Sequence, residues 1–274
     1  MSKNDDDYEI TLKKLHTLLK FGHSQLQKHQ HDLDKYNFKQ SVLFTTMPAV
    51  QSYCESIERL LSRPPYFDKA AEVLFRSLIE ALINTNYVFA HKGQKHALSF
   101  MVDSIRDRID FAKKHQRFWG DHLSWNLSFG SIKKPQGWDN FIADKKEEIQ
   151  EIKEKLNVKR IPNFPRLRNR AELSDAYLQS KGELNEQESL EKYYVLYYKH
   201  FSQLAHLSSE GLSRFFDKNG SSLNIDGTKE DARKVLGITY QVYLSLLKLF
   251  NDEFAIFDPK ELKKFSNFSE KLIQ

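Results

Sequence analysis

A polar line follows the segment YYKHFSQLAHLSSEGL, which begins at Tyr197 and otherwise has the character of an apolar helix. Tyr198, Ser202 and His206 recur every fourth residue, and Ser209 follows three residues later. At about 100° per residue, these four side chains fall within one quadrant of a helix. Because imidazole titrates near neutral pH, the line can supply a general acid or base beside hydrogen-bonding hydroxyls.

A second polar line has a similar spacing in the segment RSLIEALINTNYV. Arg76, Glu80 and Asn84 lie four residues apart, and Tyr87 follows three residues later. Leucine and isoleucine cover the rest of this helix, so we expect the Arg76–Glu80 pair to be desolvated. Removing one partner of a buried pair costs about 3–5 kcal/mol, so the pair either specifies helix packing or serves a ligand.

Two such lines that face each other would form a polar chamber between helices, where helical bundles commonly build their sites. Metal-free RNA cleavage needs a base, an acid and a cation that binds phosphate. We assign His206 as the base or acid, Arg76 as the phosphate-binding cation and Glu80 as the group that orients them. The expected substrate-binding residues are Asn84, Tyr87, Tyr198, Ser202 and Ser209. The alternative is an internal network that fixes the register of the two helices.

The segment NVKRIPNFPRLRNRAEL carries two prolines and five basic residues. One interpretation is an exposed connector, and the other is a loop that contacts phosphate. Under the second interpretation we add Arg166 and Arg168 to the predicted substrate-binding residues.

The two polar segments together resemble a large bacterial family of helical proteins that is known only as a domain of unknown function. The resemblance rests on an Arg-x-x-x-Glu helix with a nearby Asn and Tyr, followed by a Tyr-x-x-x-Ser-x-x-x-His helix. It covers about residues 50–220, and the matching positions are Arg76, Glu80, Asn84, Tyr87, Tyr198, Ser202 and His206. The family implies no particular reaction.

The expected architecture is also loosely similar to the HEPN superfamily of helical bundles, many of which are metal-independent ribonucleases of antiviral and toxin–antitoxin systems. Those enzymes share an Arg that is separated from a His by four to six residues. Arg108 with His115, and Arg117 with His122, match this spacing, but neither arginine is followed by the usual polar residue. The spacing therefore carries little weight.

Several other site classes lack their motifs. There is no His-Glu-x-x-His pattern, no nucleophile elbow, no P-loop and no glycine-rich dinucleotide motif. We therefore expect no metal and no cofactor. The single cysteine, Cys54, excludes an internal disulfide.

Composition favours helices as the elements that position both polar lines. Ten Gly and seven Pro in 274 residues leave few turns for a protein of many short strands, and 40% hydrophobic residues suffice for a core. We predict an all-α multi-helix bundle in a single domain, residues 1–274. The expected helices span residues 8–35, a segment ending at 61 with Pro48 in its first turn, 68–93, 94–117, 138–156, 189–216, 228–254 and a short C-terminal piece.

Two of these helices have a distinct character. The helix over 68–93 is apolar on most of its circumference, which is typical of a central position in a bundle. The helix over 138–156 is charged, with Glu-to-Lys pairs at helical spacing, which indicates a solvated peripheral arm or an interaction surface. The N-terminal helix and the C-terminal helices, over about 227–272, are expected to pack on the family-like core.

Our leading hypothesis is a HEPN-like effector that binds RNA and cleaves it without metal in a bacterial defence or toxin–antitoxin module. A net charge of +5 is consistent with contact to phosphate. The alternatives are a non-catalytic interaction or sensor module and a bundle that binds a nucleotide or small molecule. The expected partners are RNA or a nucleotide, a protein of the same operon and a second copy in a homodimer, with no membrane. No apolar signal-peptide core is present at the N-terminus, so we expect a cytoplasmic protein.

Overall fold

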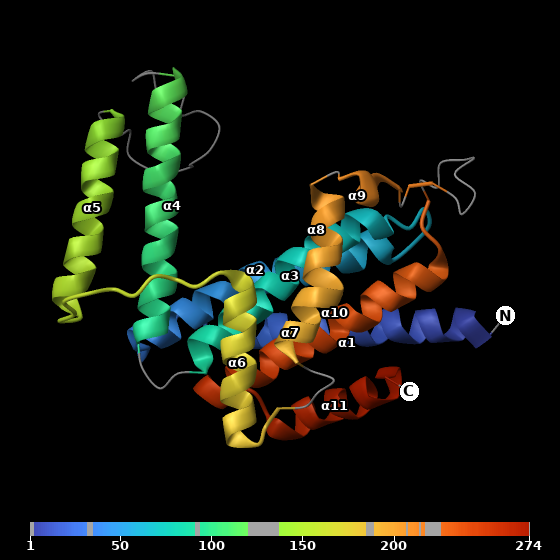
Figure 1. The fold of residues 1–274 in the computed structure, drawn as a ribbon. Helices are drawn as coiled ribbons and strands as arrows, with labels where there is room; N and C mark the ends of the chain where they lie inside the picture. Colours follow the sequence, from blue (N-terminus) through green and yellow to red (C-terminus); the bar gives the residue numbers. More distant parts are fainter. Residues whose placement is uncertain are drawn as a thin grey trace. The chain divides into compact units, whose positions relative to one another are not determined.

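The protein is predominantly helical in the residues that the computed structural model describes, namely 3–31, 35–90, 94–119, 137–184, 189–206, 208–213, 215–216 and 226–273. Within these ranges there is no strand, and one isolated β-bridge joins Tyr66 to Gly227. The prediction of an all-α bundle is confirmed. The α-helices are α1 (Lys3–His29), α2 (Phe38–Leu61), α3 (Asp68–Phe89), α4 (Lys95–Trp119), α5 (Trp138–Lys155), α6 (Leu167–Lys181), α7 (Leu190–Tyr193), α8 (Lys199–Ala205), α9 (Ser209–Ser213), α10 (Lys229–Phe254) and α11 (Pro259–Ile273) (Figure 1).

The chain divides into two compact units. The first comprises Met1–Lys92 with Arg166–Gln274, and the second comprises Gly93–Pro165. The expectation of a single domain over residues 1–274 stays a prediction. Both predicted polar lines belong to the first unit.

Helix α3 is the central helix of the first unit, as its apolar circumference predicts. It packs against α2, α10, α6 and α8, and twelve of its residues are buried. Helix α1 packs against α10 and α2. The cost of exposing so much apolar surface explains why α3 lies in the interior.

Helix α2 begins earlier than the sequence suggests. Asn37 is its N-cap and forms a capping box with Gln40, so Pro48 lies inside the helix and not in its first turn. The prediction for Pro48 is therefore wrong, because the reciprocal cap at Asn37 satisfies the N-terminal donors a few turns upstream. The start of α10 is as predicted, since the Thr228 side chain accepts a hydrogen bond from the Asp231 backbone N–H at 3.0 Å.

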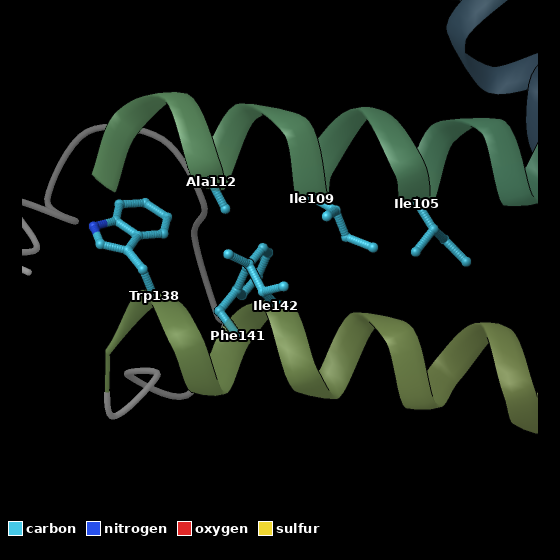
Figure 2. Packing of buried hydrophobic residues seen from close by; sticks show 6 residues of the cluster. All are labelled: Ile105, Ile109, Ala112, Trp138, Phe141 and Ile142. Atoms are coloured by element: carbon cyan, nitrogen blue, oxygen red, sulfur yellow. The ribbon is translucent and has the colours of Figure 1, made fainter. Parts of the chain in front are cut away.

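The second unit contains a helical hairpin of α4 and α5. Trp138, Phe141 and Ile142 of α5 point toward the apolar face of α4 (Figure 2). The prediction of a charged helix over 138–156 is confirmed, although this helix holds its partner with bulky apolar residues in its first turn and with Ile149 and Ile152 farther along. Residues 120–136, which the sequence suggests are a loop, lie outside the described residues.

Helix α6 is missing from the sequence-based prediction. Its residues include Arg168 and Arg170, which were assigned to a connector. The sequence gives no clear helical periodicity here, because only two of the five buried residues, Leu167 and Ala171, are apolar.

Candidate functional site

The two predicted polar lines meet at Arg76. Its Nε donates a hydrogen bond to the Ser202 Oγ at 3.2 Å, and its Nη2 donates to the Tyr198 hydroxyl at 2.8 Å. These contacts join α3 to the helical segment of α8. The structure thus brings Arg76, Tyr198 and Ser202 together, as the matched spacing of the two lines suggested.

The Arg76 guanidinium also lies over the ring of Tyr198. Its Cζ is 4.7 Å from the ring centroid, within the range of a cation–π interaction. Arginine carries five N–H donors, and these contacts use two of them. The guanidinium is therefore oriented by the protein and keeps donors for a ligand.

Tyr198 is a neutral hydrogen-bonding group in this site. Burial raises the pKa of its phenol, the Glu80 charge raises it further, and the Arg76 charge and hydrogen bond lower it. The pKa therefore lies above the ordinary value of 10.0, and the hydroxyl keeps its proton at neutral pH. The ring of Tyr194 stacks on that of Tyr198 with centroids 5.4 Å apart, which forms a small aromatic platform.

Glu80 does not form the expected ion pair with Arg76. Among the described residues its carboxylate takes part in no salt bridge or hydrogen bond, and its side chain is half-buried. The prediction fails because Tyr198 and Ser202 on the neighbouring segment draw the guanidinium away from its own helix. A carboxylate with open acceptors therefore lies near the Tyr198 hydroxyl.

Asn84 and Tyr87 have different environments from each other. The Asn84 Oδ1 is buried and accepts no hydrogen bond from the described residues. Tyr87 is 5% exposed, and the charge of the buried Arg170 on α6 partly offsets the rise that burial causes in its pKa. Tyr87 therefore lies in the packing between α3 and α6, and its role in substrate binding stays a prediction.

His206 lies at the end of the predicted line but not in contact with Arg76. It is the C-cap of α8, its backbone N–H donates to the Ser202 carbonyl at 3.0 Å, and its side chain is exposed. Within the described part of the chain, its imidazole forms no hydrogen bond or ion pair. The expected contact between imidazole and guanidinium is not made.

The continuous helix expected over residues 189–216 is interrupted. Tyr194–Tyr198 form a turn of π-helix between α7 and α8, and α8 ends before α9 begins at Ser209. Gly211 permits the close approach of α9 to the end of α8, because a Cβ there would lie 2.4 Å from the carbonyl oxygen of Gln203. Ser209 therefore starts a separate helix, and its side chain lies outside the described residues. Single π-helical turns are frequent at functional sites.

The basic segment is only partly a loop. Arg166 is exposed at the N-cap of α6, but Arg168 bonds through its Nε to Glu172 at 2.8 Å and lies 3.8 Å from Glu191. Arg170 is 7% exposed and packs in the core of the first unit. The segment is therefore a loop only up to Arg166, and α6 places Arg168 beside carboxylates and Arg170 in the interior. The assignment of Arg166 and Arg168 to substrate binding stays a prediction.

The spacing shared with HEPN ribonucleases has no support in the second unit. The His115 ring packs at a tilt against that of Trp138 with centroids 4.7 Å apart, while Arg108 is exposed on α4. His122 lies outside the described residues. In the part of the chain that the structure describes, no cluster of three or more metal-binding side chains occurs.

A groove between α1 and α2 is a site that the sequence analysis missed. It contains His16 and His23. The sequence suggests a surface position for His23, and the structure places its exposed side chain in this groove. The repeats His-x6-His on α1 and Glu-x-x-Glu on α2 are the signal that could have found it. Its geometry is described below.

The comparisons with known proteins identify a family and no function. A family model described as a family of unknown function, DUF5677, matches residues 40–223. This range contains Arg76, Tyr198 and Ser202. No curated protein and no solved structure matches the chain. None of the helices described is long and apolar enough to cross a membrane.

Proposed function

The chain belongs to DUF5677, a family of unknown function, and we propose that this member binds single-stranded RNA at the Arg76 site and cleaves it without metal. The observation that carries the proposal is the half-buried guanidinium that Tyr198 and Ser202 orient while its other donors stay open. Arginine in this state suits a phosphate, because its planar fork presents parallel N–H groups.

The surroundings of Arg76 supply further elements of RNA recognition. The stacked rings of Tyr194 and Tyr198 form an aromatic platform next to a cation, a combination that single-stranded nucleic-acid sites use. The half-buried Glu80 carboxylate has acceptors that the described residues leave open, and base amino groups are donors that fit them.

The cleavage step assigns His206 as the general base. Its imidazole takes the 2′-hydroxyl proton, the oxygen attacks phosphorus, and the 5′-oxygen leaves with a proton from the solvent or from the protonated imidazole. His206 lies one helical turn after Ser202 and is exposed, so an RNA strand bound at Arg76 can reach it. The loose likeness of the helical architecture to HEPN proteins motivates a setting in a bacterial defence or toxin–antitoxin module, with a protein of the same operon as partner.

RNA binding is tested by fluorescence anisotropy with a labelled single-stranded RNA of mixed sequence. We expect Arg76→Gln to weaken binding about tenfold or more, since a hydrogen bond to a charged group contributes about 1.5–3 kcal/mol. Arg63→Gln removes an exposed arginine after α2 and serves as the matched control. Equal affinities of wild type, Arg76→Gln and Arg63→Gln would exclude this site.

Cleavage is tested separately in EDTA between pH 6 and 8. We expect wild type and His31→Ala, which alters another exposed histidine, to cut the RNA and His206→Ala to leave it intact. RNA that stays intact with wild type removes the catalytic part of the proposal and leaves the binding part to the anisotropy experiment.

The alternative of a structural network is favoured by one observation. Both hydrogen bonds of Arg76 connect α3 to the segment of α8, so they can fix the register of these helices. Under this interpretation Arg76→Gln and Tyr198→Phe lower the free energy of unfolding by about 1–3 kcal/mol, and no variant alters RNA binding.

A further inference from the structure

A polar groove runs between α1 and α2 in the first unit. Its volume is about 550 Å³, within the size range of sites for small molecules. Two histidines of α1 and two glutamates of α2 lie in pairs along it. The groove is also lined by Lys20, Arg59 and the buried Leu19. This groove lies outside the Arg76 site and uses a helix that the DUF5677 match does not include.

Each carboxylate of the groove faces an imidazole on the opposite helix. The His16 Nδ1 lies 2.7 Å from the Glu58 Oε1, and the His23 Nδ1 lies 3.6 Å from the Glu55 Oε1. An imidazole that bonds a carboxylate through Nδ1 has its Nε2 available for a ligand. Both imidazole side chains are about half exposed, at 49% and 52%, so a ligand in the groove can reach them.

Lys20 and Arg59 are the cations of the groove that have no carboxylate partner among the described residues. Lys20 lies between the two histidines on α1, and Arg59 follows Glu58 on α2. His16 bonds to Glu58 and Gln51 bonds to Glu55, so Lys20 and Arg59 are left to interact with a ligand. Both cations can donate hydrogen bonds to an anionic group.

A buried chain of hydrogen bonds holds Glu55 in position from inside the bundle. The Tyr243 hydroxyl of α10 donates to the Gln51 Oε1, and the Gln51 Nε2 donates to the Glu55 Oε1 at 2.7 Å and to the Leu19 carbonyl at 3.2 Å. Burial raises the pKa of Tyr243 well above 10.0, so its hydroxyl stays a donor. The carboxylate that orients His23 is therefore pre-positioned, as binding sites require.

We infer that the α1–α2 groove binds a phosphate-bearing ligand of nucleotide size through Lys20, Arg59, His16 and His23. Phosphate groups accept hydrogen bonds from several donors at once, and the groove offers two cations and two imidazoles over two facing helices. The charges of Lys20 and Arg59 balance those of Glu55 and Glu58, so the groove meets the ligand through directed hydrogen bonds and not through an excess of positive charge.

The experiment measures binding of inorganic pyrophosphate, ADP and adenosine to the full chain by calorimetry at pH 6.5. We expect pyrophosphate and ADP to bind and adenosine not to bind, and the Lys20→Gln/Arg59→Gln variant to lose at least tenfold in affinity. Lys13→Gln, on an exposed position of the same helix, is the matched control and should keep wild-type affinity. Arg76→Gln should also keep it, which separates this site from the proposed RNA site.

Three outcomes overturn the inference. In the first, folded wild type binds neither pyrophosphate nor ADP. In the second, Lys20→Gln/Arg59→Gln binds ADP as tightly as Lys13→Gln does. In the third, only Arg76→Gln loses affinity for ADP. A second arm compares the ADP affinity of His16→Gln/His23→Gln with that of wild type at pH 6.5, and we expect the variant to lose at least threefold. An affinity that does not depend on the histidines contradicts their part in the site.

Discussion

The close approach of α1 to α10 makes a sharp prediction for Gly22. This glycine lies in the interior of α1, and a Cβ built on it would lie 1.9 Å from the Tyr243 hydroxyl oxygen and 2.9 Å from its Cζ. Tyr243 is fully buried and its hydroxyl bonds to Gln51. Gly22→Ala therefore either displaces the tyrosine or separates the two helices.

The expected loss follows from three opposing contributions. Overpacking a buried contact costs about 1–3 kcal/mol, and an unsatisfied Gln51–Tyr243 pair costs about another 1–3 kcal/mol. Alanine stabilises a helix interior over glycine by about 1 kcal/mol, which offsets part of this. We expect Gly22→Ala to lower the free energy of unfolding by about 3 kcal/mol.

Urea unfolding followed by circular dichroism measures the change, with Gly237→Ala as the control. Gly237 also lies inside a helix, α10, but a Cβ there meets no atom within 4 Å. We expect this control to gain about 0.5–1 kcal/mol from helix propensity alone. A Gly22→Ala variant that is as stable as wild type, or that gains as much as the control, would refute the packing of α1 against Tyr243.

Three further predictions test other parts of the fold. Asn37→Ala removes the capping box of α2 and should cost about 1 kcal/mol in urea unfolding, while a Ser variant should recover most of it. Burial raises the pKa of Tyr240 and Tyr243 in the folded state, so their stabilisation is complete below pH 10 and is lost as the pH rises further. The part of the tyrosinate absorbance that Tyr240→Phe or Tyr243→Phe removes should appear only together with alkaline unfolding, and its appearance in folded protein would contradict this. Trp138→Ala should cost about 3–5 kcal/mol in the α4–α5 hairpin, seen as faster hydrogen exchange there, whereas unchanged exchange would disprove the packing in Figure 2.

The sequence alone determined the all-α class, the central position of α3 and the bounds of α4, α5 and α10 to within two residues. These features follow from periodicity, which depends only on neighbours three and four residues apart. The same periodicity predicted both polar lines, and in the structure Arg76 forms hydrogen bonds with Tyr198 and Ser202. Spacing on a helix is enough to decide which side chains share a face.

Only the tertiary structure decided what each polar side chain contacts. Arg76 prefers a hydroxyl on another segment to the carboxylate four residues along its own helix, because packing brings the hydroxyl closer. Helix α8 ends at His206, and α9 then packs against it through Gly211, a contact that the local sequence does not reveal. The pairing of His23 with Glu55 across two antiparallel helices likewise joins residues far apart in the chain. Such contacts depend on how helices dock, whereas helix formation itself depends on local spacing, and this is why the fold class could be predicted and the site could not.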